Sequence, residues 1–147
     1  MKWVYDDGGR AAAGFKGEAG GTCVTRAIAI ATGKPYREVY YELNAFCKRA
    51  RPAGNAKSPV WRTIHRYMKS IGWRYTSTRV IVAGCKLSKC GERIPPRLHS
   101  DGLPADEILV VVVRSHCVAV IDGVIYDTFD CGNRPRLLHQ NLEWQKR

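Results

Sequence analysis

Residues 116–128 read HCVAVIDGVIYDT, two short apolar runs on either side of an Asp-Gly pair. Asp-Gly between alternating apolar runs favours a two-residue turn, so the stretch predicts an antiparallel β-hairpin. With that pair as the turn, His116 and Asp127 fall on the same face as diagonal neighbours, with Cβ atoms roughly 7 Å apart. Cys117 and Tyr126 are expected on the opposite face.

Other strand signals precede this hairpin. Ile108–Val113 is a run of aliphatic, mostly β-branched residues, which predicts an inner strand of a sheet. Residues 73–82 are rich in Trp, Tyr, Thr, Val and Ile and predict a further strand. The second half of the chain therefore reads as several antiparallel strands.

The first half of the chain carries helical signals instead. A helix is expected from Cys23, with Thr22 as its N-cap, to Gly33. It has almost no polar face, which is typical of a buried central helix. Apolar residues at helical spacing predict two more helices over 35–47 and 59–71, each beginning at a proline.

Helices followed by strands indicate an α+β fold, with N-terminal helices packed on a C-terminal antiparallel β-sheet. At 147 residues the chain fits one domain, 1–147, in which residues 1–22 form an irregular, glycine-rich lead-in segment. The formal net charge is +11, which favours attraction to nucleic acid or acidic proteins.

The sequence also indicates the compartment. No apolar run approaches the roughly 20 residues that span a membrane, so we expect no membrane partner. The N-terminal MKWVYDDGGR lacks the apolar core of a signal peptide, which predicts a cytoplasmic protein.

Six cysteines without a signal peptide are expected to be reduced thiols. Cys85 and Cys90 are separated by four residues, with His99 nearby, a spacing that does not fit the tighter pairs of zinc sites. We therefore expect no metal and no cofactor.

Cys23 differs from the other cysteines because it is expected in the first turn of a helix, where the macrodipole favours the reactive thiolate. A thiolate to attack, an imidazole to move the proton and an acid to orient the ring are the parts of a cysteine hydrolase. Cys23, His116 and Asp127 supply them in that chain order. The alternative is a structural thiol in a capped helix, beside a histidine that only satisfies a polar strand edge.

This order resembles that of papain-like cysteine peptidases, especially the compact bacterial peptidases that process bacteriocins. Four segments are also similar to a family of small phage- and plasmid-borne proteins: YDDGGRAAAGFKG (5–17), CVTRAIAIATGKPYREVYYEL (23–43), WRTIHRYMKSIGWRYT (61–76) and HCVAVIDGVIYDT (116–128). The resemblance implies a papain-like fold, with Cys23 as nucleophile, His116 as base and Asp127 as the third member.

The chain departs from that pattern at two places. The family usually has an acid or amide before the cysteine, where this chain has Thr22. Papain-like peptidases use an upstream glutamine for the oxyanion, whereas the glutamines here are Gln140 and Gln145. The oxyanion would then depend on backbone N–H groups, such as that of Cys23, or on a side chain such as Lys16.

Two functions follow as hypotheses. The first is a cysteine hydrolase that acts on a protein or peptide substrate, including isopeptides, through a thioester; a host factor in a bacterial or phage-infected cell is one such substrate. The second is a catalytically degenerate relative whose basic surface, including residues 48–57, binds nucleic acid or an acidic host protein.

Overall fold

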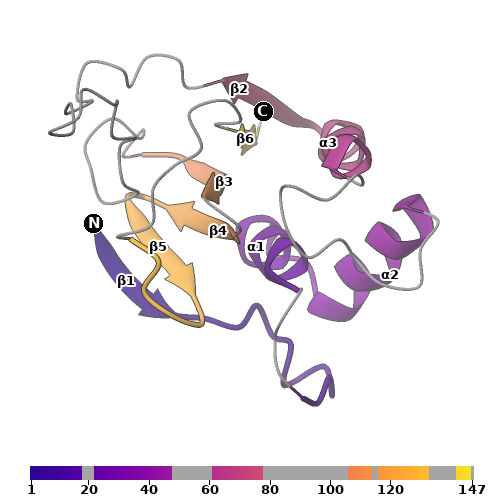
Figure 1. The fold of residues 1–147 in the computed structure, drawn as a ribbon, viewed down its shortest axis with the longest axis horizontal. Helices are drawn as coiled ribbons and strands as arrows, with labels where there is room; N and C mark the ends of the chain where they lie inside the picture. The colour runs from indigo at the N-terminus through magenta and orange to yellow at the C-terminus, as the bar shows by residue number, and fades with distance from the viewer. Residues whose placement is uncertain (18–21, 48–60, 78–105, 114–115, 133–141, 147) are drawn as a thin grey trace, which may run out of the picture.

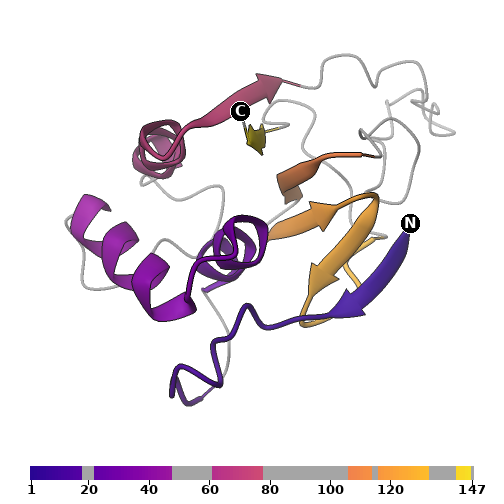
Figure 2. The same cartoon turned by 180° about the vertical axis from the view of Figure 1, so that it is seen from behind.

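The computed structural model describes residues 1–17, 22–47, 61–77, 106–113, 116–132 and 142–146. These residues form three helices and six strands. Figures 1 and 2 show the helices gathered beside one part of the sheet, with α1 lying between the strands and α2. The α+β class predicted from the sequence is confirmed.

The helices agree closely with the sequence. Helix α1 spans Cys23–Thr32 and ends at Gly33, whose φ of 70° is the left-handed conformation that glycine adopts most easily. Helix α2 spans Tyr36–Cys47, one residue after the proline expected to open it. Helix α3 spans Trp61–Ser70. The first two residues of the expected helix, 59 and 60, lie outside the described residues.

The strands make one mixed sheet in the order β1-β5-β4-β3-β6-β2. Their bounds are β1 Lys2–Tyr5, β2 Trp73–Ser77, β3 Ile108–Val113, β4 His116–Ile121, β5 Val124–Asp127 and β6 Leu142–Lys146. Strand β1 pairs with β5 in parallel, whereas the other neighbouring strands are antiparallel.

Two features of this sheet correct the sequence-based expectation. Residues 1–22 are not an irregular lead-in throughout, because Lys2–Tyr5 forms a strand at the sheet edge. The sheet is consequently mixed rather than antiparallel. Strand β2 ends at Ser77, and the rest of the expected strand over 73–82 lies outside the described residues.

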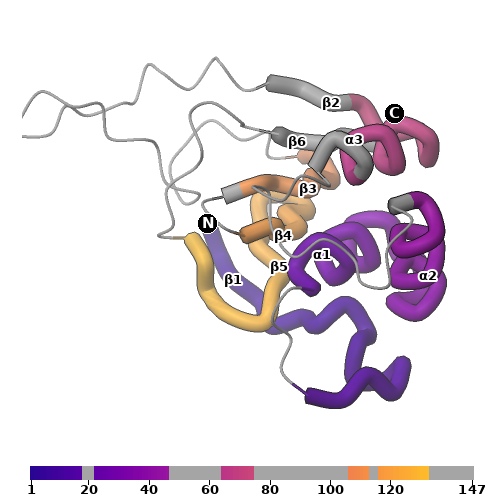
Figure 3. Tube along the Cα trace, turned by 45° about the vertical axis from the view of Figure 1, so that its right-hand side comes forward, coloured from indigo at the N-terminus to yellow at the C-terminus, as the bar shows by residue number. Residues whose placement is uncertain are grey.

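The two faces of the sheet bury separate apolar clusters. One cluster fills the space between the helices and the sheet, and it includes Val24 and Ile28 of α1 with Val110 and Ala119 of the strands. The opposite face carries a smaller cluster, in which Trp3 packs against Leu109, Val111, Val118, Val120, Ile125 and Cys131. The tube in Figure 3 shows α1 lying alongside β4 and β5, so the start of α1 is close to the central strands.

None of the helices in the described ranges has the length and apolar character needed to cross a membrane.

Candidate active site

The β4–β5 hairpin brings His116 and Asp127 together, as the sequence predicts. Its register pairs Ile121 with Val124 and continues through Ala119 and Tyr126. The turn residues Asp122 and Gly123 have φ angles of 49° and 73°, as a primed two-residue turn requires. His116 opens β4 and Asp127 closes β5, so both lie at the end of the hairpin away from the turn.

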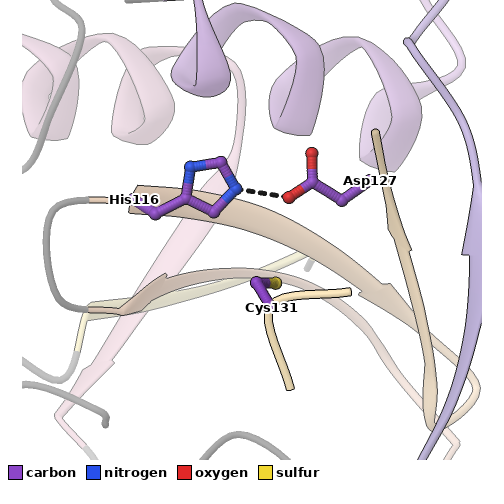
Figure 4. A group of neighbouring side chains, drawn as sticks. All are labelled: His116, Asp127 and Cys131. Carbon is purple, nitrogen blue, oxygen red and sulfur yellow. Dashed lines mark hydrogen bonds and ion pairs between the residues drawn. The ribbon is translucent and has the colours of Figure 1, made fainter. Parts of the chain in front are cut away.

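The two side chains are hydrogen-bonded and buried. His116 Nε2 contacts Asp127 Oδ2, and their side chains are 6% and 3% exposed. Figure 4 shows the carboxylate beside the imidazole, while the second ring nitrogen points away from Asp127 and toward the helices. One nitrogen is therefore oriented by the acid, and the other is directed toward the helical layer.

Cys23 is the first residue of α1, and its side chain hydrogen-bonds with His116. Burial alone lowers the pKa of His116, but the hydrogen bonds to Asp127 and Cys23 outweigh it, so the pKa of His116 lies above its ordinary value of 6.5. A raised imidazole pKa favours the imidazolium, which is the partner that a neighbouring thiolate needs. The three residues singled out from the sequence therefore meet in one cluster.

The Asp127 carboxylate is held at both oxygens. Its Oδ1 accepts hydrogen bonds from the Thr128 N–H at 2.7 Å and from Arg26 Nη2 at 3.3 Å, while Oδ2 faces His116. Burial raises the pKa of Asp127, but the bond to His116 and these additional donors reverse the direction, and the net pKa lies below 3.8. Asp127 is therefore an anion at neutral pH despite its burial.

Arg26 lies one helical turn after Cys23 and is 3% exposed. Its Nη1 donates to Thr22 Oγ1 at 3.0 Å. Thr22 occupies the N-cap position, but its side chain makes no capping hydrogen bond to the helix N–H groups. The expected role of Thr22 as a side-chain cap is therefore wrong, because its hydroxyl accepts from the Arg26 guanidinium instead.

Cys131 is a further neighbour of His116 and Asp127. Its Sγ, His116 and Asp127 offer ligand atoms within 4.8 Å of one another, as Figure 4 shows for the three side chains. Nitrogen, oxygen and sulfur donors are those that zinc accepts. However, His116 and Asp127 are bonded to each other, and Arg26 brings a positive charge to Asp127. These contacts oppose a second cation, so the donor set fits a hydrogen-bonded site better than a metal centre.

The other described thiols are poor nucleophiles. Burial raises the pKa of Cys131 to about 12, and nearby Asp127 adds to the shift. Burial also raises the pKa of Cys117 well above its ordinary value, and its side chain belongs to the cluster under the helices. Cys23, Cys117 and Cys131 are free thiols, as expected. Cys85, Cys90 and the Cys47 side chain lie outside the description.

Phe129 borders the imidazole on the surface side. Its ring centroid lies 4.9 Å from that of His116, and the residue is 38% exposed. Cys23, His116 and Asp127 are themselves at most 5% exposed. Lys16, a candidate for oxyanion support, is an exposed residue of the segment before α1.

Other sequence candidates take no part in this cluster. His65 lies in α3, and burial lowers its pKa. His99 and His139, together with Cys85, Cys90 and residues 48–57, fall outside the described residues.

Sequence reasoning missed Arg26 and Cys131. Arg26 left a signal, since it is the one charged residue in the stretch CVTRAIAIAT that forms α1. A charged residue in a buried helix needs a partner, so a buried acid could have been sought. Cys131 left no comparable signal, because it follows β5 without a regular element of its own.

We compared the chain with protein-family models, with curated proteins and with solved structures, and none of them matches it.

Proposed function

We propose that this chain is a cysteine hydrolase with a papain-like arrangement, in which Cys23 is the nucleophile, His116 the general acid–base and Asp127 the orienting acid. The observation that carries the proposal is that His116 is hydrogen-bonded both to Asp127 and to Cys23. This is the relation between nucleophile, base and orienting group that covalent catalysis requires.

The reaction would proceed through a thioester. Cys23 Sγ, as the thiolate, forms a bond to the substrate's acyl carbon, and the His116 imidazolium gives its proton to the leaving amine as the acyl–nitrogen bond breaks. The neutral imidazole then takes a proton from water, whose oxygen attacks the thioester carbon. The carbon–sulfur bond breaks, the acid product leaves, and the thiolate–imidazolium pair is restored.

The start of α1 supplies support for the oxyanion. The N–H groups of the first turn of a helix point toward its N-terminal end, where the helix dipole favours a developing negative charge. The N–H of Cys23 belongs to this turn and lies on the nucleophile itself. It replaces, in this proposal, the glutamine side chain that papain-like peptidases use.

The proposed substrate is a protein or peptide with an amide or isopeptide bond. The positive formal charge of +11 favours an acidic partner, because it raises the local concentration of anionic surfaces in a salt-dependent manner. A host protein in a bacterial or phage-infected cell fits this description.

Site-resolved alkylation tests the proposal. The full-length protein would be treated with iodoacetamide at pH 6–7, and each cysteine followed by peptide mass spectrometry. We expect Cys23 to react faster than the other thiols, and the rate at Cys23 to fall in His116→Ala. Cys117→Ala is the matched control, since it removes a buried thiol that faces the helices. Equal rates at all cysteines would contradict the proposal.

A binding role is the second candidate, and the charge of +11 supports it. A catalytically degenerate relative would bind nucleic acid or an acidic host protein through its basic residues. Mobility shifts with single- and double-stranded DNA and RNA at two salt concentrations test the first of these partners. Binding that weakens with salt and is unchanged in Cys23→Ala favours this role. Absence of binding at low salt contradicts its nucleic-acid form.

A further inference from the structure

Arg26 is a buried cation that the hydrolase chemistry does not itself require. It is three residues after Cys23 in α1, and its side chain is 4% exposed. The guanidinium spans two partners, since Nη2 lies 3.3 Å from Asp127 Oδ1 and Nη1 lies 3.0 Å from Thr22 Oγ1. One side chain thus connects the residue before the nucleophile with the acid on β5.

An ion pair so deeply buried is not explained by stability alone. Removing two charges from water carries a desolvation penalty that their attraction often fails to offset, and apolar side chains of similar volume serve stability as well. Apart from Thr25, the α1 residues around Arg26 are apolar, so a leucine or methionine would suit the helix. We therefore look for the role of Arg26 in its effect on the Asp127 carboxylate.

These contacts fix the rotation of the carboxylate. Oδ1 is held by Arg26 and by the Thr128 N–H, so Oδ2 is left facing His116 Nε2. With Nε2 engaged by the acid, the second ring nitrogen points toward the helices (Figure 4), and the Cys23 side chain hydrogen-bonds with the imidazole. A rotation of the acid would turn the imidazole with it. The guanidinium also ties α1, which carries the nucleophile, to β5, which carries the acid.

We propose that Arg26 is a positioning residue of the hydrolase, which fixes the Asp127 carboxylate against His116 and holds the nucleophile helix in register with it. This inference rests on the proposed function. Arg26 touches neither substrate nor the reacting atoms in this scheme. It acts through Asp127, which accepts from one terminal nitrogen of the guanidinium. Thr22, the residue before the nucleophile, accepts from the other.

The charged and titratable groups around Asp127 indicate the pH effect of removing Arg26. Helix α1 contributes Arg26 and Cys23, strand β4 contributes His116 and Cys117, and Cys131 follows β5. On the β1 side, Asp6 turns its own carboxylate to the Gly8 N–H. Among these groups, Arg26 is the permanent cation. Without it, burial favours the protonated acid, and protonation releases His116.

The pH dependence of Cys23 alkylation tests this role, because it needs no knowledge of the substrate. In Arg26→Gln we expect the acidic limb of the rate profile to move to higher pH, and the rate at pH 6 to fall by about tenfold to a hundredfold. Arg26→Lys keeps the charge but loses the fork, so it should recover part of the rate. Thr22→Val removes one acceptor and should produce a smaller shift in the same direction.

Lys34→Gln is the matched control. It removes a cation from the other end of α1, whose partners Glu38 and Glu42 are far more exposed, and we expect an unchanged profile. Near-ultraviolet circular dichroism checks folding. If Arg26→Gln fails to fold, Arg26→Lys and Thr22→Val decide the question. Wild-type rate and pH profile in both folded variants would overturn the role of Arg26 while leaving the hydrolase intact. A wild-type Cys23 that reacts no faster than the other thiols would overturn both.

Discussion

Helix α1 has a charged cluster near each end, and the two clusters differ in their surroundings. At its start, Arg26 meets Asp127 with both side chains at most 4% exposed. Just past its end, Lys34 meets Glu42 at 3.0 Å, with the side chains 33% and 39% exposed. Similar chemistry is thus placed in two different dielectric environments.

The exposed cluster connects helices. Lys34 also contacts Glu38 at 2.9 Å, and the Tyr67 hydroxyl of α3 donates to Glu42 at 2.8 Å. The hydrogen bonds that Lys34 donates to Glu38 and Glu42 raise the pKa of Lys34. The same bond to Lys34 lowers the pKa of Glu42. Water screens these charges, so their contribution to stability is small.

The buried cluster is different because every charge in it depends on a specific partner. Removing one partner leaves another charge without compensation in a medium that solvates it poorly. Burial strengthens the interactions among His116, Asp127 and Arg26, and it makes each of them harder to replace. The two ends therefore differ in environment: water screens the charges just past the end of α1, whereas the exclusion of water at its start makes each charge depend on its partner.

The largest effect is expected from Asp127→Ala. It leaves Arg26 buried without its anion, which should lower the free energy of unfolding by about 3–5 kcal/mol. Chemical denaturation at pH 7 measures the loss. Arg26→Met/Asp127→Leu, which removes both charges, should recover most of the stability but none of the Cys23 reactivity. A single variant as stable as wild type would contradict the importance of this ion pair.

A glycine that packs against the start of α1 provides the next effect. Gly8 has a φ of 67°, and an added Cβ would lie 3.1 Å from the Arg26 carbonyl oxygen and 3.3 Å from its Cα. Gly8→Ala therefore combines backbone strain of about 1–2 kcal/mol with a clash against backbone atoms. Thermal unfolding measures the total.

Gly33→Ala, at the other end of α1, is the control for Gly8→Ala. Its φ of 70° is similar, but an added Cβ meets nothing within 4 Å. It should show the backbone strain alone. Equal losses in the two variants would indicate that the segment before α1 yields easily.

The pH dependence of the buried pair gives a third prediction. We expect the pKa of His116, followed by its ring-proton NMR signals, to lie above 6.5 in the wild type and to fall in Asp127→Asn. The raised His116 pKa stabilises the fold below pH 6.5, and this contribution is lost as the pH rises through the folded-state pKa.

The contribution of Asp127 to stability changes with pH in the opposite direction to that of His116. Because its folded-state pKa is below 3.8, its contribution is present above that pH and disappears as the pH falls through the folded-state value. The stability difference between wild type and Asp127→Asn should therefore shrink in acid. A His116 pKa that is the same in both proteins would contradict the coupling of the pair.

The smallest effect is expected at the exposed cluster. Lys34→Gln should change the free energy of unfolding by no more than about 1 kcal/mol, because its ion pairs are partly in water. Denaturation at low and high salt measures it, and salt should weaken the wild type toward the variant. A loss as large as that of Asp127→Ala would remove the distinction between the two ends.

Local sequence patterns predicted the elements that hold the site. Helix α1, the strand Ile108–Val113 and the hairpin with its Asp-Gly turn were all readable, because each depends on residues close together in the chain. The hairpin register also predicted that His116 and Asp127 are neighbours. Regular alternation along two strands is enough for that inference.

Other features could not be read in this way. Strand β1 pairs with β5 across more than a hundred residues, and β6 lies between β3 and β2. Strands β1 and β6 are too short to show a clear pattern of alternating apolar residues. Such short strands form because neighbouring strands supply their hydrogen-bond partners. Thr22 is the N-cap residue as predicted, but the absence of a capping bond from its side chain could not be read locally, because its hydroxyl accepts from Arg26.

The sequence by itself determined the α+β class, the start of α1 at Cys23 and the shared position of His116 and Asp127, because periodicity and turn chemistry act over short distances. The tertiary structure was needed to bring α1 against the hairpin, to give His116 a contact with Cys23 and to bury Arg26 on Asp127. These contacts join residues about a hundred positions apart, and their strength comes from the exclusion of water, which no local pattern encodes.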